Sequence, residues 1–439
     1  MISSSSHTAL SPLGTSCYHG RCRRVGIAQD DRLGHMWILG KTGVGKSTFL
    51  LNLIYADLQA GRGLIVLDPH GDLVEGILAL VPAERLRDTL YFNPADTAYP
   101  VAFNPMDHGG TLPAALIASG IIGVLRKHWP EFWGPRMEYI LRASLLTLLA
   151  SPGATLLDLH RLLVDTPFRE HLVQRVTDPQ LLQFWKKEFA SYPVRFRTEA
   201  VAPIVNKTGQ YLTMPMLRYI LGQPKSAFSL RSLMDQGGIF LANLAKGRLG
   251  EDVTALLGSL LVSQVELAAL SRADVPESER PPFFLYIDEA HLMATRTMVE
   301  LFPEARKFHL GIVLAHQYLA QLPEEVRTAV LGNVGTLVAF RLGAHDAEAL
   351  APEFTPEVQA RDLVHLPAHH LCLKLLVDGT TSRPFSVMTR PAPRAAVSYR
   401  EQIMADSRRR YGKPVAEVEA ALRRGWQPDT PRYQQGLGI

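Results

Sequence analysis

Gly40-Lys-Thr-Gly-Val-Gly-Lys-Ser-Thr48 matches the full phosphate-binding loop pattern G-x-x-x-x-G-K-[ST]. The apolar residues 36–39 before it predict a buried strand, and the apolar periodicity after it predicts a helix that ends near Gly61. The next apolar run, residues 64–67, predicts a second strand that ends at Asp68. This order is one βαβ unit, which predicts an α/β fold with a mainly parallel sheet covered by helices on both faces.

The loop supplies the groups that hold nucleotide phosphates. Its glycines let backbone N–H groups approach the β-phosphate, and the following helix adds the partial positive charge of its amino terminus. Lys46 would reach the β- and γ-phosphates, and the Ser47 hydroxyl would bind magnesium. We therefore expect ATP and Mg2+ as ligands. The predicted nucleotide-binding residues are Gly40, Lys41, Thr42, Gly43, Val44, Gly45, Lys46, Ser47 and Thr48.

Another apolar strand, which ends in two acids, completes the predicted site. Residues 283–287 are apolar, and Asp288 and Glu289 follow them. At a strand end beside the phosphate loop, Asp288 would bind magnesium through water, and Glu289 would orient or deprotonate the attacking water. Asp68 ends the adjacent strand. It either borders this site or forms a turn with the Pro-His-Gly-Asp that follows it.

The order Asp288-Glu-Ala-His291 also spells the signature of DEAH-box helicases, whose phosphate loop is similar. That family keeps its acids much nearer the loop and follows them with a Ser-Ala-Thr type motif. The sequence has neither feature. We therefore interpret His291 as part of the first helical turn after the strand.

The rest of the chain predicts more strands and a large insertion. Strands are expected at residues 239–244, 283–288, 311–315 and 336–340, with a closing hairpin at 371–377 and 384–388. Lys46 and Asp288 lie 242 positions apart, whereas a βαβ crossover takes only about 30 residues. Helical spacing of apolar residues and capping motifs predict that the surplus is helical. The predicted parts are a flexible lead-in (1–30), a first core segment (31–104), a mostly helical insertion (105–230), a second core segment (231–393) and a helical tail (394–439).

Several short motifs accompany the loop and the acids. They are Asp31-Arg32, His35, Asp68-Pro-His-Gly-Asp72, Trp133-Gly-Pro-Arg136, Asn206-Lys207, Gly237-Gly238, Ile287-Asp-Glu-Ala290, Ala305-Arg-Lys307, Gln317, Phe340-Arg341 and Asp378-Gly379. With these motifs the chain resembles the FtsK/HerA superfamily of ring ATPases, and within it the coupling ATPases of type IV secretion and conjugative DNA transfer. The resemblance implies a RecA-like P-loop core with an inserted all-α domain, assembled as a hexameric ring around DNA.

Three further residues gain roles only from this resemblance. Arg306 matches the family's arginine finger, which reaches the nucleotide site of the neighbouring subunit. Gln317 matches the residue that senses the γ-phosphate and links it to DNA movement, and Arg341 is a candidate for an interface or phosphate contact. The alternatives are a solvated helix-end cation for Arg306 and a buried amide for Gln317. The predicted catalytic residues are Lys46, Glu289, Arg306 and Gln317, and the predicted metal ligands are Ser47 and Asp288.

The leading hypothesis is an ATP-driven DNA translocase that serves conjugation or type IV secretion and binds DNA largely independently of sequence. Its expected partners are further copies of itself, a relaxase and secretion-channel proteins. The alternatives are a HerA-like repair motor that works with a nuclease, and a docking adaptor in which nucleotide gates recruitment. Neither the membrane anchor usual in coupling proteins nor a HerA-like β-barrel precedes Asp31. We expect a cytoplasmic protein without a membrane-spanning segment, brought to the cytoplasmic face of the membrane by partners.

Composition constrains the remaining possibilities. Of the 439 residues, 47% are hydrophobic, which is enough for a large buried core. The 46 Lys+Arg against 42 Asp+Glu are compatible with a nucleic-acid partner, but they do not indicate a dedicated basic nucleic-acid-binding protein. Cys17, Cys22 and Cys372 are too few for a disulfide framework, which favours a reducing cytoplasm. The group Cys17-His19-Cys22 lacks a standard zinc spacing and a fourth ligand, so we interpret it as part of a mobile terminus.

A basic stretch in the predicted insertion is one place where nucleic acid could bind. Arg195, Arg197 and Lys207 lie there with the aromatic residues Tyr192 and Phe196. Charged stretches of this kind are usually solvated faces of a helix, and we interpret this one in the same way.

Overall fold

The computed structural model describes residues 10–426 except 19, 108, 110 and 111. The chain divides into two compact units. The first comprises the described residues up to Phe92, Leu230–Gly258 and Ala268–Ala405. The second comprises Asn93–Ser229, Ser259–Leu267 and the described residues from Asp406 onward. The second unit therefore begins earlier than the insertion predicted from residue 105, and it includes part of the predicted tail.

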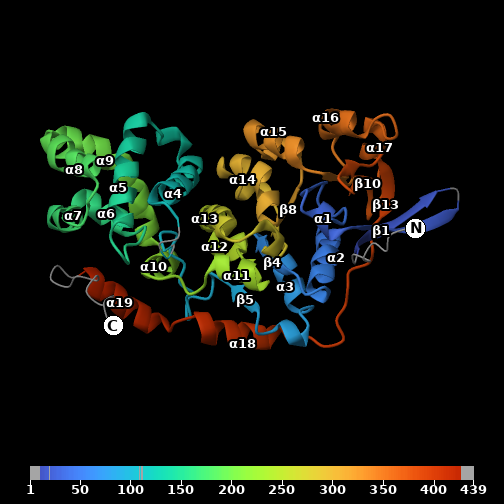
Figure 1. Cartoon of the computed structure of the whole chain (residues 1–439), viewed down its shortest axis with the longest axis horizontal. Helices are drawn as coiled ribbons and strands as arrows, with labels where there is room; N and C mark the ends of the chain where they lie inside the picture. The colour runs from blue at the N-terminus through green and yellow to red at the C-terminus, as the bar shows by residue number, and fades with distance from the viewer. Residues whose placement is uncertain (1–9, 19, 108, 110–111, 427–439) are drawn as a thin grey trace. The chain divides into compact units, whose positions relative to one another are not determined.

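An eleven-stranded sheet organises the first unit (Figure 1). The strands from β9 to β5 run parallel, and the four strands at the other end join antiparallel. The α/β class with a mainly parallel sheet is thus confirmed. The spatial order is β2 (Arg21–Ile27), β1 (Ser11–Tyr18), β13 (Phe385–Met388), β10 (His370–Lys374), β9 (Thr336–Ala339), β3 (Met36–Leu39), β8 (Leu310–His316), β7 (Phe283–Ile287), β4 (Gly63–Asp68), β6 (Ile239–Asn243) and β5 (Thr89–Phe92).

The central strands are buried along their whole length, as expected for a parallel sheet with both faces covered. On one face, Phe49 and Leu53 of α2 (Lys46–Gln59) join a core cluster with Ile38, Val66 and Phe284 of the strands. Residues of α3 (Asp72–Leu78) extend the same cluster. The apolar runs that predicted these strands are therefore the residues that fix the helices against the sheet.

Helices and a small sheet complete the first unit. The two-stranded sheet consists of β11 (Leu376–Val377) and β12 (Thr380–Thr381), which flank the predicted Asp378-Gly379 turn. Its other helices are α1 (Gln29–Arg32), α11 (Leu230–Gln236), α12 (Lys246–Leu249), α14 (Thr297–Ala305), α15 (Glu324–Asn333), α16 (Ala344–Phe354) and α17 (Ala360–Val364).

The second unit is helical. Its helices are α4 (Ala114–His128), α5 (Pro135–Leu149), α6 (Asp158–Val164), α7 (Thr166–Val173), α8 (Pro179–Gln183), α9 (Val194–Thr213), α10 (Pro215–Leu221) and α19 (Val415–Trp426). The helices α13 (Glu251–Ser271) and α18 (Arg400–Tyr411) contribute residues to both units. Among the described residues, the segment Glu251–Asp274 is long and apolar enough to cross a membrane, and 83% of its apolar window is buried within the fold.

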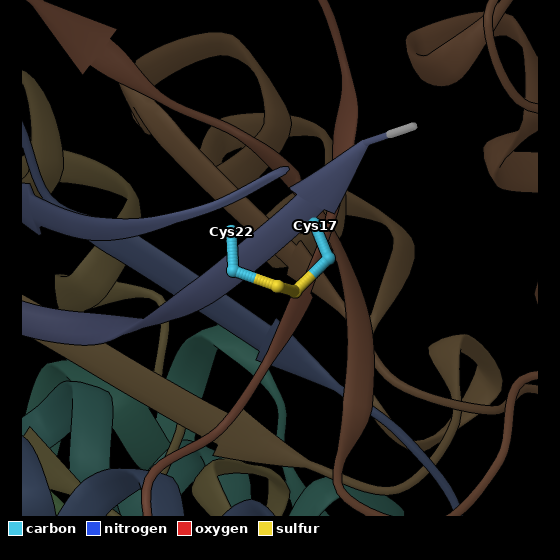
Figure 2. Close-up of a disulfide and its surroundings, with 2 residues drawn as sticks. All are labelled: Cys17 and Cys22. Atoms are coloured by element: carbon cyan, nitrogen blue, oxygen red, sulfur yellow. A yellow bond between two sulfur atoms is a disulfide. The ribbon is translucent and has the colours of Figure 1, made fainter. Parts of the chain in front are cut away.

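The amino-terminal residues differ from the predicted flexible lead-in. Residues 11–27 form the hairpin β1–β2, which joins the main sheet where Thr15 lies opposite Met388. Cys17 and Cys22 face each other across this hairpin, and they form a disulfide (Figure 2). The expectation of a mobile Cys17-His19-Cys22 segment is thus corrected at both cysteines, and the disulfide removes the support that the cysteine count gave to a reducing compartment. His19 lies outside the described residues.

A buried ion network lies between α1, α2 and β7. Nη2 of Arg32 donates to Oδ2 of Asp57 at 2.9 Å and to the Tyr286 hydroxyl at 2.5 Å. Nη1 of Arg62 donates to Oδ1 of the same carboxylate at 3.0 Å. Arg32 and Asp57 are 2% and 0% exposed, so the pair needs these additional hydrogen bonds to offset its desolvation. The network fixes the chain just before β3.

Candidate nucleotide site

The predicted phosphate loop runs from the end of β3 to the start of α2. Gly43 and Gly45 have φ angles of 76° and 111°, which residues other than glycine rarely adopt. A Cβ atom at Gly45 would lie 2.8 Å from Nδ1 of His369. Both the backbone angle and this close approach therefore require glycine at position 45, and Ser47 follows with an exposed side chain.

The side chain of Lys46 folds back against the phosphate loop. Its ammonium donates to the carbonyl oxygens of Gly40 at 2.5 Å and Lys41 at 3.0 Å. Burial lowers the pKa of Lys46, and the negative charges of Glu289 and Asp288 oppose that shift. The lysine thus lies close enough to both acids to interact with them electrostatically.

Strand order brings the predicted site residues to one edge of the sheet. The neighbouring parallel strands β3, β8, β7 and β4 end just before Gly40, Gln317 and Asp288, and at Asp68. Asp288 is 6% exposed, and its Oδ1 accepts the Glu289 N–H at 3.0 Å. Burial raises the pKa of Asp288 to about 7, and the carboxylates of Asp68 and Glu289 add to this.

These carboxylates fit a divalent cation. A buried carboxyl group beside two others is stabilised in its charged form by a positive ion at the same place. Among the residues that the structure describes, no group of three or more His, Cys, Asp or Glu side chains has a metal-binding arrangement. A magnesium ion in such a site would be held by one or two protein oxygens together with phosphate oxygens and water. Asp288 and Ser47 remain the candidates for those protein oxygens.

Asp68 combines both roles considered for it. Its carboxylate accepts the backbone N–H groups of His70 at 2.8 Å and Val74 at 3.0 Å, so it shapes the turn into α3. The same carboxylate interacts with Asp288 and raises the pKa of that residue.

Gln317 connects the phosphate loop to Glu289. Its Nε2 donates to Oε1 of Glu289 at 2.8 Å, and its Oε1 accepts the Thr42 hydroxyl at 3.1 Å. Glu289 has a φ of 44°, a strained value for this residue type, and its buried Oε2 has no hydrogen-bond partner within the described residues. One amide therefore contacts two groups expected on either side of a γ-phosphate.

Two histidines approach Glu289. Nε2 of His70 lies 3.9 Å from Oε1 of the glutamate, and Nδ1 of His291 lies 3.5 Å from its Oε2. His291 belongs to the short 3-10 helix η6 (Ala290–Leu292), which agrees with its interpretation as part of the first turn after the strand.

Arg306 lies at the opposite edge of the sheet. It begins the turn η7 (Arg306–Phe308), just before β8 starts at Leu310, whereas Gln317 follows the end of β8. The seven residues of β8 span roughly 20 Å at the usual rise per residue. The Arg306 side chain is exposed, and its guanidinium makes no hydrogen bond or ion pair with any residue that the structure describes. The fold therefore does not bring Arg306 to the phosphate loop of its own chain.

Arg341 and His369 border the loop. The carbonyl oxygen of Arg341 accepts the Lys41 N–H at 3.0 Å, and the Val44 carbonyl accepts the N–H of His369 at 2.8 Å. His369 has a φ of 65° and no sequence motif marks it. The parts of this site that sequence reasoning missed are His369, the approach of His70 to Glu289 and the contact of Thr42 with Gln317.

The basic stretch of the insertion is partly engaged within the second unit. Arg195 pairs with Glu199 one helical turn away, and Nη2 of Arg197 donates to the carbonyl oxygens of Ala190 and Tyr192 at 3.2 Å. These contacts are those of a helix face that stabilises its own surroundings.

Comparisons with known proteins agree with this architecture. A family model described as the DNA-binding domain of type IV secretion-system coupling proteins matches residues 22–351. The bacterial conjugative coupling protein TrwBdeltaN70 is 15% identical, with a TM-score of 0.62 over 87% of this chain and 90% of that chain. The plasmid coupling protein TrwB in complex with ADP and Mg2+ is 16% identical, with a TM-score of 0.61 over 89% and 97%.

A further solved structure gives a similar result. VirB4 of Thermoanaerobacter pseudethanolicus is 16% identical, with a TM-score of 0.52 over 91% of this chain and 99% of that chain. At these identities the structures establish a shared fold. A search of curated proteins found no match.

Proposed function

Because the chain belongs to the family of type IV secretion-system coupling proteins, we propose that it hydrolyses ATP with Mg2+ and moves DNA as a ring-forming motor. The observation that carries this proposal is the bridge from Thr42 through Gln317 to Glu289. A protein that only binds nucleotide has no need to hold a carboxylate and an amide together beside its phosphate loop. A hydrolytic enzyme needs both, one for the water and one to detect the phosphate.

The residues at the carboxyl edge divide the reaction between them. Lys46 and the loop N–H groups bind the β- and γ-phosphates, and Ser47 and Asp288 hold the magnesium ion. The ion, when bound, neutralises charge that develops on the phosphate oxygens. Glu289 orients the attacking water and accepts its proton through a carboxylate oxygen. Gln317 holds the carboxylate in place and responds to the γ-phosphate.

Arg306 acts on a second copy of the chain. Because its guanidinium lies at the amino edge, it can complete a nucleotide site only when another subunit presents its carboxyl edge. Such a residue, contributed by a neighbour, would stabilise the charge on the transferring phosphoryl group. This arrangement supports a closed ring, and we propose a hexamer. Arg341 is a further interface candidate.

The proposed partners follow from the motor. DNA would bind mainly through its phosphates, so affinity would depend little on base sequence. A relaxase or secretion-channel proteins would recruit the ring. We place it in the cytoplasm, at the inner surface of the membrane through those partners.

The deciding experiment measures ATPase rate with and without mixed-sequence DNA, together with native mass and DNA affinity. We expect stimulated turnover, a ring-sized oligomer and an affinity that falls steeply between about 50 and 200 mM salt. ATP binding without turnover would favour the docking adaptor instead. Tight DNA binding that salt leaves unchanged over this range would contradict the translocase.

A further inference from the structure

A buried tryptophan and a buried histidine lie side by side beneath the nucleotide site. Trp37 belongs to β3, the strand that carries the phosphate loop, and His316 is the last residue of β8. Both are 0% exposed. Their ring planes are 23° apart and their centroids 5.5 Å apart, and Nε1 of Trp37 donates to Nε2 of His316 at 2.7 Å.

Both nitrogens of the His316 ring are engaged. Because the indole N–H can only donate, Nε2 of His316 accepts, and the proton of the neutral ring is on Nδ1. That N–H donates to the Tyr318 carbonyl oxygen at 3.1 Å. Burial lowers the pKa of His316 to about 4, which agrees with a neutral ring. The imidazole therefore connects β3 to the residue just beyond Gln317.

The turn after His316 is held from two more directions. Oε1 of Gln321 accepts the backbone N–H groups of Gln317 at 3.0 Å and Tyr318 at 3.1 Å. Oδ1 of Asp346, in α16, accepts the Leu319 N–H at 3.3 Å. The contacts converge on the backbone that carries Gln317.

We propose that Trp37 and His316 are positioning residues that hold Gln317 between Thr42 and Glu289. This inference rests on the proposed function, since it assigns Gln317 a part in hydrolysis. Trp37 lies three residues before Gly40, and its ring contacts the residue before Gln317. A displacement of the phosphate loop along β3 is thereby transmitted to the turn that carries the amide. Neither positioning residue touches nucleotide.

The first test compares two Trp→Phe substitutions, each of which removes one buried indole hydrogen bond. Trp185, in the second unit, is 4% exposed and donates its Nε1 proton to the Thr147 hydroxyl at 2.7 Å, so Trp185→Phe matches Trp37→Phe in what it removes. We expect Trp37→Phe to lower kcat about tenfold with ATP affinity unchanged, the size expected for one buried hydrogen bond. Trp185→Phe should lower thermal stability about as much as Trp37→Phe does, but it should leave kcat unchanged.

The second test changes His316, which accepts the hydrogen bond from the Trp37 indole. A glutamine amide reaches the place of Nε2, so His316→Gln can still accept from Trp37. An asparagine amide reaches only the place of Nδ1, so His316→Asn keeps a donor for Tyr318 but loses the indole. We expect His316→Gln to retain a kcat several-fold above that of His316→Asn. Equal rates for the two variants, in folded protein, would overturn the role of the indole bond.

Coupling to Gln317 separates this inference from the proposed function. If Trp37 acts through Gln317, adding Trp37→Phe to Gln317→Ala should lower kcat no further. A wild-type rate in Gln317→Ala would show that the proposed role of the amide is what failed. A strong defect in Gln317→Ala with a wild-type rate in Trp37→Phe would overturn the positioning role alone. Additive losses in the double variant would also overturn it.

Discussion

The two edges of the parallel sheet hold their buried polar side chains differently. At the carboxyl edge, Gly45 and Glu289 adopt φ angles of 111° and 44°, and the buried Oε2 of Glu289 has no hydrogen-bond partner within the described residues. At the amino edge, both nitrogens of His35 are hydrogen-bonded, to the Phe302 carbonyl at 3.0 Å and the Ile312 N–H at 3.2 Å. Positive φ angles occur at both edges, since His35 has a φ of 64°, but a buried carboxylate oxygen without a hydrogen-bond partner is the feature expected where a ligand binds. We therefore propose that the carboxyl edge is the reactive one and that the amino edge is mainly scaffold.

Arg306 is the exception at the amino edge. It is exposed, whereas Arg32 nearby is buried in a network with Asp57. In the proposed ring, this exposed guanidinium links the scaffold edge of one chain to the reactive edge of the next. The contrast between the edges then describes the two halves of one active site.

Mixing two inactive variants tests whether the amino edge of one chain completes the carboxyl edge of another. Lys46→Ala should lose hydrolysis because the phosphates lose their main side-chain cation, and Arg306→Ala should lose about three to five orders of magnitude. When the two are mixed and exchange subunits, some interfaces pair an intact loop with an intact Arg306, and activity should return. The measurement is ATPase rate against mixing ratio with DNA present, after mass confirms mixed oligomers.

Lys307→Ala serves as the matched control, because this neighbouring exposed cation already pairs with Glu304. It should retain most of the wild-type rate. A mixing curve that stays at zero would remove the action of Arg306 on a neighbouring subunit and, with it, the main support for a ring.

Glu289→Gln tests whether Glu289 acts on the attacking water at the carboxyl edge. The glutamine keeps an oxygen that can accept from Gln317 but cannot take a proton from water, so ATP should bind normally and turnover should fall by about two to four orders of magnitude. Retention of labelled ATP and single-turnover rates measure the two effects separately. Glu304→Gln, on a half-exposed residue away from the carboxyl edge, is the control. Wild-type turnover in folded Glu289→Gln would remove the catalytic role.

The sequence predicted the reactive edge better than the outer parts of the sheet. Phosphate chemistry requires fixed residue types at fixed spacing, and central parallel strands are continuous apolar runs, so both are visible locally. The strand β5 and the hairpin β1–β2 were missed because they lie at the ends of the sheet. Pairing there depends on register with distant strands, as for Cys17 opposite Cys22.

Contacts between distant residues were also beyond local reasoning. Thr42 and Gln317 are 275 positions apart, and His369 reaches the loop through its backbone N–H, which any residue but proline could supply.

The scaffold edge makes the last and smallest prediction, which concerns acid stability. Burial lowers the pKa of His35 from 6.5 to about 4, and the positive charge of Arg306 adds to this. Between these two values the unfolded chain binds a proton that the folded chain does not, so unfolding becomes more favourable as pH falls from about 6.5 to 4. His35 alone should lower the free energy of unfolding by about 3 kcal/mol across this window, with no contribution above it.

His35→Asn tests this prediction directly, because asparagine tolerates the positive φ of 64° and can still accept the Ile312 N–H. Urea unfolding at several pH values should show a shallower loss of stability below pH 6.5 than in the wild type. His345→Asn, at a side chain that is 90% exposed, controls for the loss of one imidazole. A wild-type slope in His35→Asn would mean that this histidine is not held neutral, and that the amino edge is less rigid than its hydrogen bonds imply.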